Sequence, residues 1–194
     1  MTFTRAIGLG AGAIIKLIVR GLALAKIHPN VLTFIGLLIN IYAAVLLAQG
    51  RFLAAGLVIV GASIFDMVDG RVARATGQVT RFGGFFDSVM DRYSDLALLM
   101  GLLVYYANIG RNFYVVLTAV VMTASVLISY TRSRSENTIP SCKVGFLERP
   151  ERIVLLFIGA LFDRMAPVLW VIAVVGNITV IHRMWHTCLF TKSM

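Results

Sequence analysis

The chain has 194 residues, of which 59% are hydrophobic and only 14% are charged. Soluble domains usually carry about 25% charged residues, so this composition, with a mean hydropathy of +0.87, predicts an integral membrane protein. The formal charge of +9 does not indicate nucleic-acid binding, because the basic residues lie between long apolar stretches and form no solvated basic patch.

The N-terminal segment, residues 1–28, is predicted to form an amphipathic helix that lies in the membrane interface. Its four basic residues project onto one side of a helix, and Ile, Leu and Val cover the rest. The sequence His28-Pro29-Asn30 is expected to end this helix, because proline disfavours helical geometry in the residue before it.

Six membrane-spanning helices are predicted after this segment, so residues 29–188 form an all-α six-span bundle and residues 1–194 a single domain. Several uncharged runs are shorter than the roughly 20 apolar residues that a span needs, so flanking charged residues must continue these helices. Ionisable groups therefore enter the membrane boundary, where they are costly and usually functional. The predicted spans are 31–50, 52–75, 84–109, 112–135, 149–163 and 165–187.

The distribution of basic residues predicts how the bundle is oriented. An even number of spans places both termini on one side of the membrane. The loops on the other side then carry only Arg51, Arg111 and Arg164, and the remaining fifteen basic residues lie on or near the side of the termini. By the positive-inside rule, that side is cytoplasmic. We therefore expect a multi-pass protein of the cell (inner) membrane with both termini in the cytoplasm.

Four aspartates are concentrated where the second and third spans meet the cytoplasm. Asp66 and Asp69 are spaced i, i+3, and Asp87 and Asp91 are spaced i, i+4, so each pair projects from one helix face. Because the two helices run antiparallel, the four carboxylates should converge, and their repulsion would be severe without cations. Oxygen ligands favour magnesium, manganese or calcium over zinc, and two such ions would suit a diphosphate.

A structural network is the alternative interpretation of these acids. Arg71, Arg74, Arg81 and Arg92 lie nearby in sequence and could form ion pairs with them. Arginines are also expected beside bound phosphates, and a glycine at position 70 leaves room for a ligand at the backbone.

The whole segment resembles the signature of the CDP-alcohol phosphatidyltransferases. Its fixed positions read Asp66-x2-Asp69-Gly70-x2-Ala73-Arg74-x8-Gly83-x3-Asp87-x3-Asp91. This resemblance implies that Asp66, Asp69 and Asp87 hold two Mg²⁺ or Mn²⁺ ions with the help of Asp91, which is also the position of the general base. It further implies a juxtamembrane helix before six spans, and a homodimer.

The same resemblance implies a substrate and its contacts. An alcohol attacks the β-phosphorus of CDP-diacylglycerol, a carboxylate accepts its proton, and CMP leaves. The residues expected to contact the CDP moiety are Gly70, Arg74, Thr80 and the turn Pro29-Asn30-Val31-Leu32. Asp95 follows Asp91 by one helical turn but is outside the signature, so it is either a supporting residue of the site or a member of a structural ion pair.

Arginines near the ends of the later spans point to a phosphorylated acceptor, because guanidinium groups clamp phosphate through paired hydrogen bonds. These segments resemble the bacterial phosphatidylinositol phosphate synthases, which implies that Arg132, Arg152 and Arg183 hold inositol phosphate. Arg132 stands where that group usually has lysine. Glycerol 3-phosphate is the rival acceptor, and positive-inside bias with snorkelling to lipid headgroups is the non-catalytic explanation.

Two other classes of protein also gather acidic residues in membranes. A membrane prenyltransferase holds a diphosphate through magnesium, but nothing in that chemistry requires the glycines or the Ala73-Arg74 pair. A cation transporter is expected to carry polar groups near the bilayer midplane, whereas these acids cluster at one face. Both classes remain alternatives that CMP release distinguishes.

Overall fold

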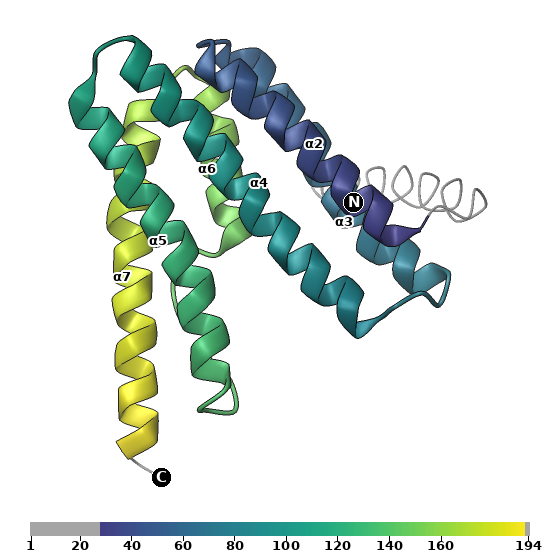
Figure 1. Ribbon diagram of the computed structural model, residues 1–194. Helices are drawn as coiled ribbons and strands as arrows, with labels where there is room; N and C mark the ends of the chain where they lie inside the picture. The colour runs from purple at the N-terminus through teal and green to yellow at the C-terminus, as the bar shows by residue number, and fades with distance from the viewer. Residues whose placement is uncertain (1–27, 193–194) are drawn as a thin grey trace, which may run out of the picture. The chain divides into compact units, whose positions relative to one another are not determined.

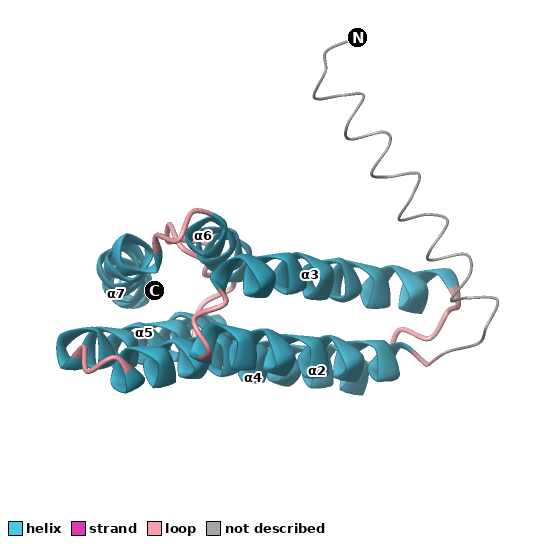
Figure 2. Cartoon of the chain, turned by 90° about the horizontal axis from the view of Figure 1, so that it is seen from above, coloured by secondary structure: helices cyan, strands magenta, loops and turns pink. Residues whose placement is uncertain are grey.

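The computed structural model describes residues 28–192, apart from the side chain of Asp69. This part of the chain forms six α-helices connected by loops and contains no strand (Figure 1 and Figure 2). The helices are α2 (Pro29–Ala48), α3 (Phe52–Ala75), α4 (Arg81–Asn108), α5 (Asn112–Glu136), α6 (Arg149–Leu161) and α7 (Met165–Lys192). The all-α prediction is confirmed, whereas the predicted interfacial helix over residues 1–28 lies, except for His28, outside the described residues.

Each predicted span coincides with one helix. The largest difference is at the end of the last span, which was predicted at residue 187 but continues as helix to Lys192. The uncharged run ends before Arg183 and the span was predicted to end at residue 187, but backbone hydrogen bonds continue a helix regardless of side-chain polarity. Helix boundaries and membrane boundaries therefore need not coincide.

Within residues 28–192, four helices are each long and apolar enough to cross a membrane, namely α2, α3, α5 and α7. Helix α4 has 28 residues but carries several charged side chains in its first half. Helix α6 has 13 residues, about 20 Å at 1.5 Å per residue. It begins beside Pro150 and ends before Asp163, whose φ of 52° is incompatible with a continuing helix.

The chain divides into two compact units. One takes the described part of Met1–Ile39 with Val60–Tyr93, and the other takes Asn40–Ile59 with the described part of Ser94–Met194. The single-domain prediction stays a prediction, since α2, α3 and α4 each contribute residues to both units.

The second unit contains an apolar core in which α7 packs against α5 and α6 (Figure 1). Its most buried side chains include Leu47, Ile59, Leu98, Leu102, Val121, Leu169 and Ile172. Within this unit α2 and α4 also approach closely, because a Cβ atom added at Gly101 would overlap the carbonyl of Ala44. The glycine at position 101 is therefore required by helix packing.

Candidate active site

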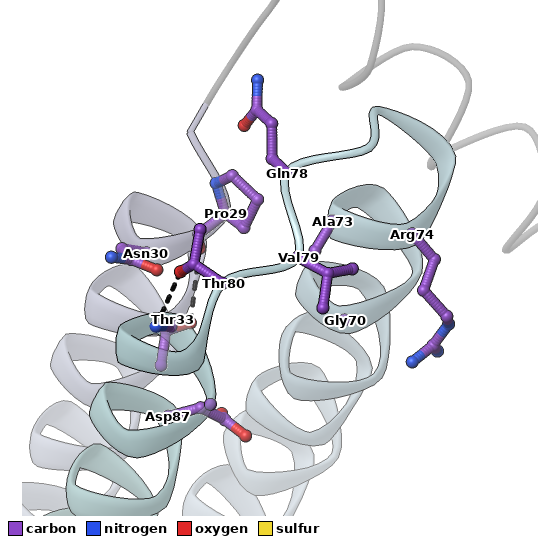
Figure 3. A pocket seen from close by; sticks show the side chains of 12 residues that line it. Pro29, Asn30, Thr33, Gly70, Ala73, Arg74, Gln78, Val79, Thr80 and Asp87 are labelled. Carbon is purple, nitrogen blue, oxygen red and sulfur yellow. Dashed lines mark hydrogen bonds between the residues drawn. The ribbon is translucent and has the colours of Figure 1, made fainter.

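A cavity of about 300 Å³ lies in the first unit, where α2 begins, α3 ends and α4 begins (Figure 3). Its lining residues are Pro29, Asn30, Thr33, Gly70, Ala73, Arg74, Gln78, Val79, Thr80, Gly83, Gly84 and Asp87. Five of the residues predicted to contact the CDP moiety are among them, namely Pro29, Asn30, Gly70, Arg74 and Thr80. The structure thus gathers most of the predicted nucleotide contacts around one cavity, together with one of the predicted metal ligands.

The loop between α3 and α4 forms one wall of the cavity, and its conformation follows from two residues. Gly77 has a φ of +68°, a left-handed conformation that suits glycine and allows the chain to leave α3. Thr80 then caps α4, because its Oγ1 accepts a hydrogen bond from the backbone N–H of Gly83 at 2.9 Å (Figure 3). The cap fixes the position of Thr80 at the cavity.

Gly83 has a steric reason to be glycine. A Cβ atom at this position would lie 3.0 Å from Thr80 Oγ1 and 3.4 Å from Asn30 Oδ1. A larger residue would therefore press on the cap of α4 and on the first turn of α2. The second glycine of the signature thus maintains the shape of the cavity.

The predicted contact segment Pro29–Leu32 forms the first turn of α2, which begins two residues before the predicted span. Proline is compatible with the start of a helix, where its missing N–H is not needed, and His28 Nδ1 accepts a hydrogen bond from the Asn30 N–H at 3.2 Å. Helical residues face successive directions, so Leu32 is buried at 1% exposure while Val31 is 49% exposed. Neither lines the cavity, which Thr33 lines instead.

Gly70 lies on the cavity wall without being required there by the protein's own packing. A Cβ atom at this position would lie 3.6 Å and 3.8 Å from the two terminal nitrogens of Arg74, which are ordinary contact distances. A side chain at position 70 would therefore take up cavity space rather than clash. The first glycine of the signature is best explained by room for a ligand.

The predicted metal-binding aspartates lie on two helices of the first unit. Asp66 belongs to α3, whereas Asp87 and Asp91 are one turn apart on α4, and all three are half-buried. Figure 3 shows the Asp87 carboxylate directed from α4 toward α3. The Asp66 carboxylate lies against α2, because a Cβ atom at Gly36 would be 2.9 Å from Asp66 Oδ1.

These donors fit a hard divalent cation. The available ligands are carboxylate oxygens from α3 and α4, and no cysteine or histidine of the described residues lines the cavity. Among the described side chains, no group of three acidic, histidine or cysteine residues is already arranged to hold a metal ion. The side chain of Asp69 lies outside that set, so the site of four aspartates stays a prediction.

In the second unit, one glutamate connects two of the arginines predicted to bind the acceptor. Glu148 Oε1 lies 2.9 Å from Arg132 Nη1 on α5 and 3.1 Å from Arg183 Nη2 on α7. Arg183 is 1% exposed, and its Nε donates to the Val144 carbonyl at 2.8 Å while its Nη1 donates to the Ile128 carbonyl. The Arg183 guanidinium is therefore fixed, with one nitrogen directed at Glu148.

The third predicted arginine, Arg152, is held by a different acid. Arg152 is 4% exposed, and its Nη2 lies 2.5 Å from Asp95 Oδ2. The other Asp95 oxygen lies 3.3 Å from Arg149 Nε. Of the two roles considered for Asp95, the structure shows the ion pair. Arg152 Nη1 is buried and has no hydrogen-bond partner in the described part of the chain.

Sequence reasoning missed Glu148 and did not assign Asp95. The only available signal was local, since Glu148 belongs to the same GFLERPER stretch as Arg149 and Arg152. Its pairing with Arg183 joins residues 35 positions apart, and that of Asp95 with Arg152 joins residues 57 apart. No helical spacing encodes such pairs.

Comparison with known proteins gives a family match over most of the chain. The sequence model of the CDP-alcohol phosphatidyltransferases matches residues 26–190. The chain is 35% identical over 166 residues to the archaetidylinositol phosphate synthase of Pyrococcus horikoshii, covering 85% of this chain and 86% of that protein. It is 35% identical over 181 residues to the phosphatidylinositol phosphate synthase of Mycobacterium tuberculosis (strain H37Rv), covering 88% of this chain and 83% of that protein.

Solved structures agree with the sequence match. The crystal structure of Mycobacterium tuberculosis phosphatidylinositol phosphate synthase with CDP-DAG bound has a TM-score of 0.84 at 32% identity, covering 90% of this chain and 94% of that chain. The structure of that synthase in complex with manganese and citrate gives 0.81 at 33% identity, covering 89% and 88%. The chain that carries the Asp66–Asp91 pattern thus belongs to the CDP-alcohol phosphatidyltransferase family.

Proposed function

We propose that this chain transfers a phosphatidyl group from CDP-diacylglycerol to the hydroxyl of a phosphorylated polyol, inositol 1-phosphate, and releases CMP. The observation that carries the proposal is the cavity in which Asn30, Gly70, Arg74, Thr80 and Asp87 meet. The names of the relatives support the acceptor, because both the archaeal and the mycobacterial proteins are inositol phosphate lipid synthases.

The donor would bind with its CDP moiety in this cavity. Arg74 supplies positive charge for the diphosphate, and Asn30 and Thr80 supply polar side chains for the nucleoside. Asp66, Asp69, Asp87 and Asp91 would hold two Mg²⁺ or Mn²⁺ ions. When bound, these ions would neutralise charge on the diphosphate and on the departing CMP.

Asp91 is proposed as the general base. Its carboxylate accepts the proton of the acceptor hydroxyl, and the hydroxyl oxygen forms a bond to the β-phosphorus of CDP-diacylglycerol. The bond between that phosphorus and the oxygen bridging to CMP breaks, and CMP leaves with the electron pair. Phosphoryl transfer depends mainly on positioning and charge stabilisation. The reaction therefore needs only one side chain that accepts a proton, which is Asp91 in this proposal.

The acceptor's phosphate would bind to Arg132, Arg152 and Arg183, named here the arginine cluster. The buried Arg152 Nη1 supports this assignment, because a buried guanidinium nitrogen without a partner is costly and a phosphate oxygen would satisfy it. Arg183 supports it as well, because its guanidinium is already fixed by two backbone carbonyls. Fixed donors lose little conformational entropy when a ligand binds.

Orientation and assembly are also proposals. The distribution of basic residues supports a location in the cell membrane with the active site and both termini on the cytoplasmic side. Homodimer formation is proposed from the resemblance to the family. Crosslinking of the protein in native membranes tests the dimer, and protection of the termini from external protease tests the orientation.

Gly70→Ala is expected to leave the protein folded but to weaken binding of CDP-diacylglycerol by about tenfold or more, which corresponds to about 1.4 kcal/mol. The added methyl group would occupy cavity space while making only ordinary contacts with Arg74. The measurements are the KM for CDP-diacylglycerol and the thermal unfolding temperature.

Gly101→Ala is the matched control, because the same methyl group there overlaps the Ala44 carbonyl. This variant should unfold at a lower temperature than the wild type. If Gly70→Ala instead lowered the unfolding temperature as much and left the KM unchanged, position 70 would serve packing rather than donor binding.

The proposed function is tested by CMP release from CDP-diacylglycerol with purified protein and Mg²⁺. The acceptors to compare are inositol 1-phosphate, glycerol 3-phosphate, serine and free inositol. Inositol 1-phosphate should give the highest kcat/KM, and EDTA should stop the reaction. Turnover with glycerol 3-phosphate alone would show that the assignment of inositol 1-phosphate as acceptor is wrong. The proposed transfer from CDP-diacylglycerol would still hold. Transfer from an isoprenoid diphosphate, or cation flux across liposomes without CMP release, would refute the proposed reaction.

A further inference from the structure

One oxygen of Glu148 occupies the space between two guanidinium groups of the arginine cluster. Glu148 Oε1 accepts hydrogen bonds from Arg132 Nη1 at 2.9 Å and from Arg183 Nη2 at 3.1 Å. A phosphate oxygen held between two arginines makes the same pair of charge-assisted hydrogen bonds. An anion that belongs to the protein thus takes the contacts that the proposed function assigns to the acceptor.

The arginines on either side of Glu148 have other partners that keep their orientation. The Arg183 Nε and Nη1 atoms donate to the carbonyls of Val144 and Ile128. Arg132 Nε lies 3.2 Å from Glu136 Oε1, one turn later on α5. Both guanidinium groups would therefore stay in place if the Glu148 carboxylate moved away.

The Glu148 side chain can leave without unwinding α6. Its side chain is 44% exposed, whereas that of Arg183 is 1% exposed. Its backbone N–H is held separately by Glu151 Oε2 at 2.9 Å, and its carbonyl accepts the backbone N–H of Arg152 at 3.3 Å. Glu148 also belongs to a capping box at the start of α6, in which its side chain accepts a hydrogen bond from the backbone N–H of Glu151. Rotation of the Glu148 side chain would break this cap and the contacts to Arg132 and Arg183, but it would leave the two hydrogen bonds of the Glu148 backbone intact.

We propose that Glu148 competes with phosphorylated acceptors by occupying the place of the acceptor's phosphate in the free enzyme. The proposal rests on the proposed function of the arginine cluster. A phosphate and a carboxylate cannot share this place, because like charges about 4 Å apart repel. Binding therefore requires the acceptor to displace Glu148.

This exchange lowers the affinity for phosphorylated acceptors. A phosphate dianion makes stronger contacts with two guanidinium groups than a carboxylate does and can replace it. The hydroxyl group of an unphosphorylated polyol has no charge to offset the loss of the Glu148 contacts, so it leaves Glu148 in place. The preference for a phosphorylated acceptor therefore comes from the arginines, and Glu148 reduces the affinity with which they hold it.

The test compares Glu148→Gln with Glu136→Gln. Both variants remove one negative charge next to Arg132, but only the first removes the anion that also contacts Arg183. Glu148→Gln should lower the KM for inositol 1-phosphate by about fivefold or more, the factor expected when about 1 kcal/mol of repulsion is removed. The KM for free inositol should change much less, because an acceptor without a phosphate does not displace Glu148. Glu136→Gln should change the KM by less than about twofold.

A second readout does not depend on turnover. Binding of inorganic phosphate to purified protein without CDP-diacylglycerol, measured by calorimetry, should be tighter in Glu148→Gln than in the wild type. Glu148→Ser should bind phosphate more tightly as well, and it should fold, because serine is a favoured residue before a helix. An unchanged or weaker affinity for phosphate in both variants would overturn the proposal and make Glu148 a positioning residue for the arginines.

The two proposals fail in different ways. If none of the phosphorylated polyols supports CMP release by the wild type, the proposed function fails, whatever the affinities of the variants for inorganic phosphate are. If the wild type uses inositol 1-phosphate but Glu148→Gln has an equal or higher KM for it, only the role of Glu148 fails.

Discussion

Asp91→Asn is expected to lower CMP release by about 10²- to 10⁴-fold, the usual contribution of a general base. Asparagine keeps the shape of the side chain but cannot accept the proton of the acceptor hydroxyl. Binding of CDP-diacylglycerol should be largely retained, because the other predicted ligands and the cavity contacts Asn30, Arg74 and Thr80 are unchanged. The measurements are the initial rate of CMP release and the equilibrium binding of the donor lipid.

Asp163→Asn is the matched control for this substitution. Asp163 is an exposed acid in the loop between α6 and α7, and its φ of 52° lies in a region that asparagine also adopts. This variant should release CMP at the wild-type rate. Equal losses of donor binding and of turnover in Asp91→Asn would contradict the role of general base and leave Asp91 as a ligand only.

Asp95→Asn is expected to lower the free energy of unfolding by about 3 to 5 kcal/mol, the usual cost of removing one partner of a buried ion pair. The Asp95 and Arg152 side chains are 8% and 4% exposed, so the substitution leaves a buried guanidinium without its counter-charge. The measurement is the equilibrium unfolding of the purified protein by SDS in mixed micelles.

The exposed pair of Arg132 and Glu136 provides the comparison. Their side chains are 36% and 38% exposed, so Glu136→Gln should cost less than about 1 kcal/mol. A similarly small loss for Asp95→Asn would show that water or another group compensates Arg152. The assignment of Asp95 as a structural partner would then be wrong.

The helices were predictable from their apolar runs, which were continued through flanking charged residues where a run is too short for a span. Every helix has an uncharged run at its centre, and Gly77 and Pro150 mark boundaries that the sequence states directly. The cavity was predictable for a different reason. Gly70 and Arg74 are one turn apart on α3, and Thr80 and Gly83 form a cap at the start of α4, so local spacing determines which face each one lies on.

The remaining features depend on geometry that the sequence does not encode. All four residues of the first turn of α2 were expected to contact the CDP moiety, but its helical phase directs Leu32 into the interior and Val31 outward. The two acids that hold the arginine cluster pair across different helices, so their partners follow from packing. An acidic residue that balances the charge of a functional arginine is therefore identified from the structure and not from a motif.

The most direct test of the central claim is the mass of the lipid formed from CDP-diacylglycerol and inositol 1-phosphate by the purified protein. We expect a lipid that joins the diacylglycerol phosphate to inositol and keeps the acceptor's own phosphate, with one CMP released per lipid formed. A lipid without the second phosphate, or CMP release that does not require the acceptor, would contradict the proposed reaction.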